Sequence, residues 1–393
     1  MLLLALLLAA AFPGTAQARS FALEDYFQPS HGGFYASELI PASPVSGRRI
    51  AGRALRLPDA VRGPVLSPDR RVVAFGGKNF GEVVRVDLAH MRLLAPVKVG
   101  GNAVDVLAWP SPDRMLVLTG PQESKWPAPK TLRVVDPVAG RVLASRPLGV
   151  VVATSTSAAG EAVVVATKPT HVGEDSIGPA HVAIAAPDGA IRELVLAHVT
   201  AGFDTLATRM PGLAVDFAAQ RAWVIGGGES VAEVDLATGA VQDRPALAAS
   251  TAPAKPPHGT GTQNATEGPR RMAQWLGDGL VAVSGYDGAI VDYDQADTPA
   301  GLRILDTRTW TERVIDPNAD SFTLAGGTLL TGRNGYGSDG RRRFRLPTSN
   351  WWVQQGRLYV FANRHHTQLR DPATGATLRT FRKGWNLLSL FDV

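Results

Sequence analysis

The sequence contains no cysteine among its 393 residues. This absence excludes disulfide bonds, thiolate catalysis, iron–sulfur clusters and zinc sites built from cysteine. Charged residues are also scarce, because Asp, Glu, Lys and Arg make up 19% of the chain, against about 25% in an average soluble protein. The 41 glycines and 28 prolines favour many tight turns between short strands over long, charged surface helices.

Apart from one short run, Arg341–Arg343 with Arg345, the chain has no concentrated positive segment of the kind that binds nucleic acids. Its formal net charge is +5, and the excess is spread along the sequence. No nucleic-acid-binding motif accompanies it. We therefore expect no nucleic-acid partner and interpret the positive charge as favouring solubility.

Long apolar runs are absent except at the start, where Met1–Phe12 reads MLLLALLLAAAF. This run has the length of the apolar region of a signal peptide and is too short for an ordinary membrane span. Ala16-Gln17-Ala18 has the small-x-small form of a cleavage site, although no Lys or Arg precedes the run. We expect a signal peptide over residues 1–18 and a secreted, periplasmic or cell-envelope protein with no transmembrane segment in the mature chain. A buried N-terminal helix is the alternative.

One phrase recurs along the chain as an apolar strand, a polar turn and a second, more apolar strand. It reads VLSPDRRVVAFGG in its first copy and LAWPSPDRMLVLTG in its second. Short runs rich in valine and aromatics, bounded by Gly, Asp and Pro, predict strands joined into hairpins. The seven copies begin at Val65, Leu107, Thr156, Val215, Gln274, Phe322 and Trp352.

A second phrase follows the first and consists of a strand ending in Asp, a turn containing Gly, and another strand. Asp at the strand end can accept backbone N–H bonds, and Gly supplies the positive φ that closes the turn. The string Asp-x-Ala-Thr-Gly or Asp-Pro-x-Ala-Gly is too similar in three places to arise from unrelated turns. The pairs are Asp136 with Gly140, Asp235 with Gly239 and Asp371 with Gly375, and degenerate copies occur at Asp87 and Asp306.

The two hairpins together make a four-stranded antiparallel unit. Asp136 and Asp235 are 99 residues apart with one copy between them, so the period is about 49 residues. Such a unit cannot cover both of its own faces, and radial stacking covers them. We expect an all-β propeller over residues 48–393, with seven blades as the favoured number and a range of six to eight. A pair of β-sandwiches is the competing architecture, but it does not explain the fixed order of the two phrases.

The remaining segments are assigned around this repeat. Residues 19–47 are expected to be an N-terminal extended segment, and residues 246–269, rich in Ala, Thr, Pro and Gly, a flexible surface insertion. Arg49–Leu57 and Trp385–Val393 each look like a lone strand. Pairing both in one sheet would close the ring and remove two free edges.

The hairpin VLSPDRRVVAFGG followed by VDPVAGRVLAS resembles the repeat of bacterial YVTN-type and quinoprotein-dehydrogenase-like propellers, a WD40-like superfamily. The resemblance covers roughly residues 48–393. It implies a fold and hardly a function, because the shared residues are turn residues. The tryptophan motif and vicinal disulfide of quinoproteins and the Gly-His and Trp-Asp pairs of WD40 repeats are not recognisable here.

Carboxylates gather in the segment GYDGAIVDYDQAD, where they could supply oxygen ligands to Ca²⁺. Their spacing is not that of an EF-hand loop, and a solvated acidic loop is the alternative that we favour. No other cofactor is predicted. The four candidate ligands are Asp287, Asp292, Asp294 and Asp297.

Other polar residues are candidates for a binding surface, although none has metal-ligand spacing. On a strand, His365 and His366 would point to opposite faces. The glycine-rich segments 226–228 and 332–335 lack the Lys-Ser/Thr of a phosphate loop and are interpreted as turns. The alternating Arg341, Arg343 and Arg345 could meet an anionic partner, but we favour a solvated strand edge. The candidate binding residues are His171, Glu174, Asp175, Arg333, Asn334, His365 and His366.

No catalytic constellation emerges from these residues, and a propeller hosts binding modules and enzymes alike. We expect an exported, monomeric, non-catalytic propeller that binds a protein, peptide or glycan across its loop-bearing face. The alternative is a propeller enzyme of lactonase-like or quinoprotein-like type, with a polar or metal site at the central channel.

The signal-peptide assignment predicts a mature protein that begins near Arg19. N-terminal sequencing of the protein from culture fluid or the cell envelope of its host tests this. Recovery of the chain from the cytosol with Met1 intact would contradict it.

Overall fold

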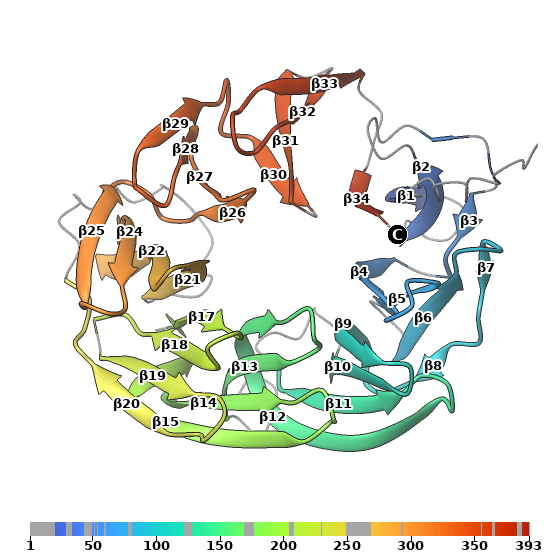
Figure 1. Cartoon of the computed structure of the whole chain (residues 1–393), viewed down its shortest axis with the longest axis horizontal. Coiled ribbons are helices and arrows are strands. Elements are labelled where there is room, and N and C mark those ends of the chain that lie inside the picture. Colours follow the sequence, from blue (N-terminus) through green and yellow to red (C-terminus); the bar gives the residue numbers. More distant parts are fainter. Residues whose placement is uncertain are drawn as a thin grey trace, which may run out of the picture.

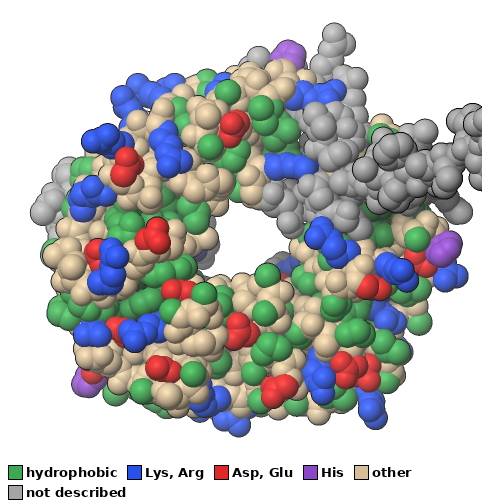
Figure 2. Space-filling view, in the orientation of Figure 1, with side chains coloured by type: hydrophobic (Ala, Val, Ile, Leu, Met, Phe, Trp, Pro, Cys, Tyr) green, Lys and Arg blue, Asp and Glu red, His purple; other side chains and the backbone are tan. Residues whose placement is uncertain are grey.

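The structure is a computed structural model in which every regular element of the described residues is a strand. It describes residues 20–28, 34–42, 49–50, 52, 54–58, 60–77, 81–121, 128–168, 177–203, 208–228, 230–248, 269–291, 294–354, 356–363, 366–382 and 387–392. The strands form a ring of antiparallel sheets that follows the chain around a hollow centre (Figures 1 and 2). The expected all-β propeller architecture is therefore confirmed. No helix in the described part of the chain is long and apolar enough to cross a membrane.

The described strands group into eight four-stranded units, here called blades 1 to 8. Blade 1 contains the first strands of the chain and also its last strand. It consists, from the outer edge inward, of β3 (Leu55–Arg56), β2 (Phe34–Ala42), β1 (Ser20–Gln28) and β34 (Leu387–Asp392). Blade 2 consists of β4 (Val61–Leu66), β5 (Val72–Gly77), β6 (Glu82–Asp87) and β7 (Arg92–Leu93), and the short β8 (Val97–Lys98) also pairs with β6.

Blades 3 and 4 form one continuous eight-stranded sheet because they share the long strand β12 (Arg141–Thr156). Its first half is the outer strand of blade 3, and its second half is the inner strand of blade 4. Blade 3 also holds β9 (Ala103–Ser111), β10 (Arg114–Gly120) and β11 (Lys130–Asp136). Blade 4 also holds β13 (Ala162–Thr167), β14 (Gly178–Ala185) and β15 (Ile191–Phe203), with the short β16 (Thr208–Arg209) paired to the end of β15.

The remaining four blades follow in chain order, each built from its innermost strand outward. Blade 5 is β17 (Gly212–Asp216), β18 (Arg221–Ile225), β19 (Val231–Asp235) and β20 (Val241–Arg244). Blade 6 is β21 (Arg270–Gly277), β22 (Leu280–Val291), β24 (Leu302–Asp306) and β25 (Thr311–Asp316), with β23 (Asp294–Pro299) paired to the far half of β22. Blade 7 is β26 (Thr323–Ala325), β27 (Thr328–Thr331), β28 (Asn334–Tyr336) and β29 (Arg342–Arg345). Blade 8 is β30 (Trp351–Gln354), β31 (Arg357–Asn363), β32 (His366–Arg370) and β33 (Thr377–Arg382).

Each of the seven hairpins expected from the sequence begins one of blades 2 to 8. The remaining unit, blade 1, closes the ring. The favoured number of seven is thus exceeded by one, within the expected range. The extra blade arises because segment 19–47, expected as an extended segment before the propeller, supplies β1 and β2. The sequence SFALEDYFQ of β1 contains neither recurring phrase, so the repeats do not predict this strand.

The two segments expected to close the ring, Arg49–Leu57 and Trp385–Val393, contribute β3 and β34 to one sheet, but these two strands are not direct neighbours. β34 pairs with β1 through Phe21↔Phe391 and Ala22↔Leu390, whereas β3 pairs with β2 at the opposite edge. The blue N-terminal strands and the red β34 meet in Figure 1. Beyond its own sheet, β34 contacts β30 of blade 8 and β4 of blade 2, so it bridges the first and last parts of the ring.

The hydrophobic core lies between the blades, and single strands contribute to two core clusters. In β13 every residue is buried. Val163 and Val165 pack in the cluster shared with blade 5, whereas Val164 and Ala166 pack in the cluster shared with blade 3. Because alternate residues of a strand point to opposite faces, a blade with this sequence must have a neighbour on each side.

The Asp-Gly turns join the third and fourth strands of their blades. The carboxylate of Asp136 accepts hydrogen bonds from the amides of Val138 and Ala139 at 2.9 and 2.8 Å. Gly140 has φ of +67°, which a residue with a side chain adopts only at a cost. In blade 6, Asp306 occupies the same place, and the hydrogen bond from the Arg308 side chain lowers the pKa of Asp306 to about 2.

The connections between strands lie on two opposite faces of the ring, and the strand order determines the face on which each one lies. In each blade the turns between strands one and two and between strands three and four lie at one end, because antiparallel strands alternate in direction. The connections between strands two and three, and those between blades, lie at the other end, here called the loop-bearing face. These include the connections from β10 to β11, from β13 to β14 and from β20 to β21.

The turn geometry predicts a graded loss of stability when glycines are replaced by valine. Gly375→Val should destabilise more than Gly140→Val, because both have positive φ but a Cβ at 375 would lie 2.5 Å from Phe344 Cγ while one at 140 meets nothing. The conformational cost alone is about 1 kcal/mol or more. Chemical denaturation measures both against Gly178→Ala, whose site is open and has no positive φ. Equal midpoints for all variants would contradict the turn assignment.

Candidate functional site

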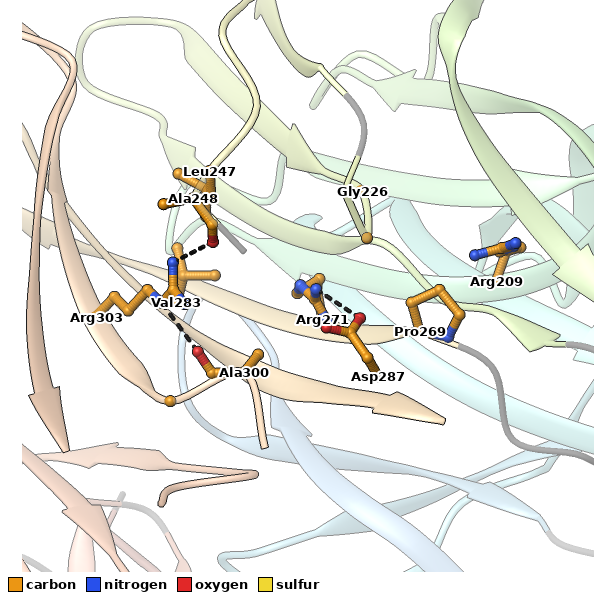
Figure 3. Close-up of a pocket in the computed structure, with 13 residues that line it drawn as sticks. Arg209, Gly226, Leu247, Ala248, Pro269, Arg271, Val283, Asp287, Ala300 and Arg303 are labelled. Atoms are coloured by element: carbon orange, nitrogen blue, oxygen red, sulfur yellow. Dashed lines mark hydrogen bonds and ion pairs between the residues drawn. The ribbon is translucent and has the colours of Figure 1, made fainter. Parts of the chain in front are cut away.

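A cavity of about 320 Å³ opens between blades 5 and 6 (Figure 3). It is lined by Arg209, by residues 226–228, by residues 247–248 and 269, and by the adjoining ends of β21, β22 and β24. These segments are the connections between blades and between second and third strands. The cavity therefore belongs to the loop-bearing face.

Three glycines form the wall contributed by blade 5, in the connection from β18 to β19. A Cβ at Gly227 would lie 2.3 Å from Cβ of Pro269, so only glycine allows the two connections to approach this closely. Gly228 has φ of +77°, and a Cβ there would meet only open space. Among the described residues, no group accepts a hydrogen bond from the amides of Gly227 and Gly228. The interpretation of 226–228 as a turn fits this geometry, and the turn also shapes a cavity wall.

Arg303 holds one end of the cavity together. Its side chain is 7% exposed, and its Nε donates a hydrogen bond to the carbonyl oxygen of Ala300 at 2.9 Å. Its Nη1 donates to the carbonyl of Ala248 and lies 3.1 Å from the carboxylate of Glu312. Glu312 in turn accepts a hydrogen bond from the amide of Ala248 at 2.7 Å. Arg303 therefore fixes the connection that leaves blade 5.

Arg271 lines the cavity between Arg209 and Arg303 (Figure 3). Its side chain is 10% exposed, and its Nη2 donates to Asp287 Oδ1 at 2.8 Å. Its Nη1 also donates to the carbonyl of Tyr286 at 3.0 Å. These bonds hold the guanidinium in one orientation beside the cavity.

Arg209 differs from the other two arginines because it has no charged or hydrogen-bonded partner among the described residues. The next residue fixes its place, since the amide of Met210 donates to the carbonyl of Pro269 at 3.1 Å and the Met210 carbonyl accepts from the amide of Arg271 at 2.7 Å. The backbone of Arg209 is thus anchored to β21 while its half-buried guanidinium remains available. Figure 3 shows Arg209 and Arg303 on opposite sides of Arg271.

The charges around the cavity do not cancel. Arg209, Arg271 and Arg303 supply three positive charges, while Asp287 and Glu312 supply two negative ones that are already engaged. Among the described residues, one positive charge therefore has no counter-charge. A guanidinium presents several N–H donors in a planar fork that matches a carboxylate or phosphate group, so the arrangement can bind an anion.

Of the candidate calcium ligands that the structure describes, only Asp287 lines this cavity. It is paired with Arg271 rather than with other carboxylates. Asp294 and Asp297 lie in β23, opposite Val291 and Gly288 of β22, and Asp292 lies outside the described residues. Within the described ranges, no three or more His, Asp or Glu side chains are arranged to hold a metal ion.

The other predicted binding residues are scattered over the ring. His171, Glu174, Asp175 and His365 lie outside the described residues, and His366 begins β32 in blade 8. Arg333 donates its Nε to the carbonyl of Leu346 at 3.0 Å, and Asn334 begins β28. Arg333 and Asn334 lie at the connection from β27 to β28, and His366 lies at the corresponding connection of the neighbouring blade 8, so their role in binding stays a prediction. The exposed arginines of β29 lie on the outer edge of that blade.

A second charged cluster joins blades 3 and 4. Arg146 Nη2 and Lys168 Nζ lie 2.6 and 3.1 Å from the carboxylate oxygens of Glu193. Burial raises the pKa of Glu193, but these hydrogen bonds outweigh it and hold the pKa below its ordinary value. His181 Nδ1 is 3.2 Å from Glu193 without hydrogen-bond geometry, and burial together with Lys168 lowers the pKa of His181. The carboxylate of Glu193 thus links the two blades through its ion pairs with Arg146 and Lys168.

No family model matches the chain, and no curated protein is significantly similar to it. Among solved structures, apo AztD from Citrobacter koseri is similar over 96% of this chain and 98% of its own, at 12% identity and a TM-score of 0.52. Dihydro-heme d1 dehydrogenase NirN, in complex with DHE, is similar over 94% of this chain and 75% of its own, at 13% identity and a TM-score of 0.50.

The chain shares its β-propeller fold with these two structures over nearly all of its length. The resemblance inferred from its repeats is therefore confirmed at the level of the fold. The hydrazine synthase of Kuenenia stuttgartiensis is similar over 52% of this chain and only 61% of its own length, at 14% identity and a TM-score of 0.35. At these identities the solved structures establish the fold of this propeller alone.

Proposed function

We propose that this propeller is an exported, non-catalytic binding module whose loop-bearing face takes a protein or peptide partner, with the cavity between blades 5 and 6 as the anchoring pocket. The observation that carries the proposal is Arg209, which lines the cavity without a partner among the described residues. Counted over those same residues, it gives the cavity one positive charge in excess. Export rests on the expected signal peptide over residues 1–18.

The construction of the pocket supports specific recognition. The side chains of Arg271 and Arg303 are held by hydrogen bonds, so a ligand would meet two cationic groups that are already oriented. A volume of about 320 Å³ lies at the lower end of the range of about 300–1,000 Å³ for ligand pockets. The pocket would therefore hold one group of a larger partner, and the rest of the partner would contact the surrounding connections.

The lining residues favour binding over catalysis. The described lining contains no serine, threonine, histidine or lysine, and its one carboxylate, that of Asp287, is paired with Arg271. It thus offers hydrogen-bond donors but no nucleophile beside a general base, which covalent hydrolytic catalysis requires. A glycan partner, the third class considered from the sequence, is less suited to the charge of the pocket unless it is anionic.

Selection of peptides from a displayed library tests the proposal. The wild-type protein should enrich a defined set of sequences, and Arg209→Glu should abolish the enrichment because it reverses the excess charge of the pocket. Arg341→Glu is the matched control, since Arg341 is 89% exposed in a turn on the opposite face. Absence of enrichment by the wild type, or enrichment that survives Arg209→Glu, would overturn the proposal.

A further inference from the structure

We infer that the pocket between blades 5 and 6 recognises a singly charged carboxylate attached to an apolar body, such as the carboxyl-terminal residue of a peptide with an aliphatic side chain. This inference rests on the proposed binding function and specifies the chemistry of the group that enters the pocket. It follows from the charge balance, the available donors and the apolar part of the lining.

The charge balance selects a monoanion. Among the described residues, the three arginines, Asp287 and Glu312 leave one excess positive charge, which one carboxylate neutralises. A phosphate monoester carries nearly two negative charges at neutral pH and would leave negative charge beside Asp287. Such an excess is unfavourable in a partly buried site, where screening by water is weak.

The available donors suit a planar group. Arg209 offers its guanidinium edge, which can form two parallel hydrogen bonds to the two oxygens of a carboxylate. Arg271 lies between Arg209 and Arg303 and adds positive charge from a fixed position (Figure 3). The amides of Gly227 and Gly228 donate to no acceptor among the described residues, and they carry no side chain of their own that would cover them.

The apolar lining determines what the carboxylate is attached to. Leu247, Ala248, Val283, Pro269 and Ala300 line the same cavity as the arginines. Burying an aliphatic side chain against such a surface is favourable, by roughly 25 cal/mol for each Å² removed from water. A small sugar acid or a free inorganic anion would leave this part of the pocket uncovered.

The experiment measures binding of N-acetyl-leucine and of its amide to the purified full-length protein by calorimetry. The two probes share an apolar body, and only the first carries a carboxylate. We expect N-acetyl-leucine to bind about tenfold or more tightly than the amide, the difference typical of a charge-assisted hydrogen bond. Inorganic phosphate should bind more weakly than N-acetyl-leucine. Equal binding of the amide, or preference for phosphate, would overturn the inference.

Three variants connect the binding to the named residues. Arg209→Gln should weaken N-acetyl-leucine about tenfold, and Arg341→Gln on the opposite face should leave it unchanged. Asp287→Asn should strengthen it severalfold, because it removes the counter-charge of Arg271, which backbone carbonyls still hold. This opposite sign separates the pocket from a general loss of folding. No change in Arg209→Gln would overturn the inference.

A leucine-terminated pentapeptide with a free or amidated carboxyl end distinguishes the two sources of such a group. Tighter binding of the free peptide than of N-acetyl-leucine identifies a peptide terminus, whereas equal binding identifies a small free acid. If displayed peptides are enriched through Arg209 but N-acetyl-leucine does not bind, the inference fails while the binding function stands. If N-acetyl-leucine binds but no peptide is enriched, the proposed protein or peptide partner fails while the carboxylate pocket stands.

Discussion

The constraint on which the rest of the structure depends is that each blade is apolar on both faces. Alternate residues of β13 enter two different core clusters, and β18 does the same, with Ala222 and Val224 in one cluster and Trp223 and Ile225 in another. A four-stranded sheet with two apolar faces is stable only between two neighbours. A linear stack would leave its first and last faces exposed to water, and a closed ring does not.

Closure also explains where the candidate site lies. The inter-blade cores end where the strands end, and irregular connections cover the seams between blades. At the seam between blades 5 and 6 the covering is made by glycines and by arginines that hold backbone carbonyls, as Arg303 holds Ala248 and Ala300. Burying charged groups is costly unless they are paired and hydrogen-bonded. Arg271 and Arg303 meet this condition within the protein, whereas Arg209 would meet it by binding a ligand.

The sequence was sufficient to predict the blades whose signals are local. A turn such as that of Asp136 and Gly140 is determined within a few residues, so its repetition reveals both the period and the strand order. The closing blade depends on pairing between Phe21 and Phe391, and no local phrase encodes a contact of that sequence separation. The same reason hides the pocket, because Arg209, Arg271 and Arg303 come from three separate segments with ordinary sequence neighbours. The run Gly226-Gly227-Gly228 is the one local feature of the pocket that stands out in the sequence. Because it lacks the Lys-Ser/Thr of a phosphate loop, it predicted a turn and no ligand site.

The ring closes through the pairing of β34 with β1. Deleting Trp385–Val393 removes this strand and exposes β1 together with the neighbouring faces of blades 2 and 8. Thermal unfolding of the truncated protein, followed by circular dichroism and light scattering, measures the effect. The closed ring predicts that the truncated protein loses its cooperative transition and associates, and that the added peptide WNLLSLFDV restores the transition. A soluble monomer with a melting temperature close to that of the full chain would contradict this account.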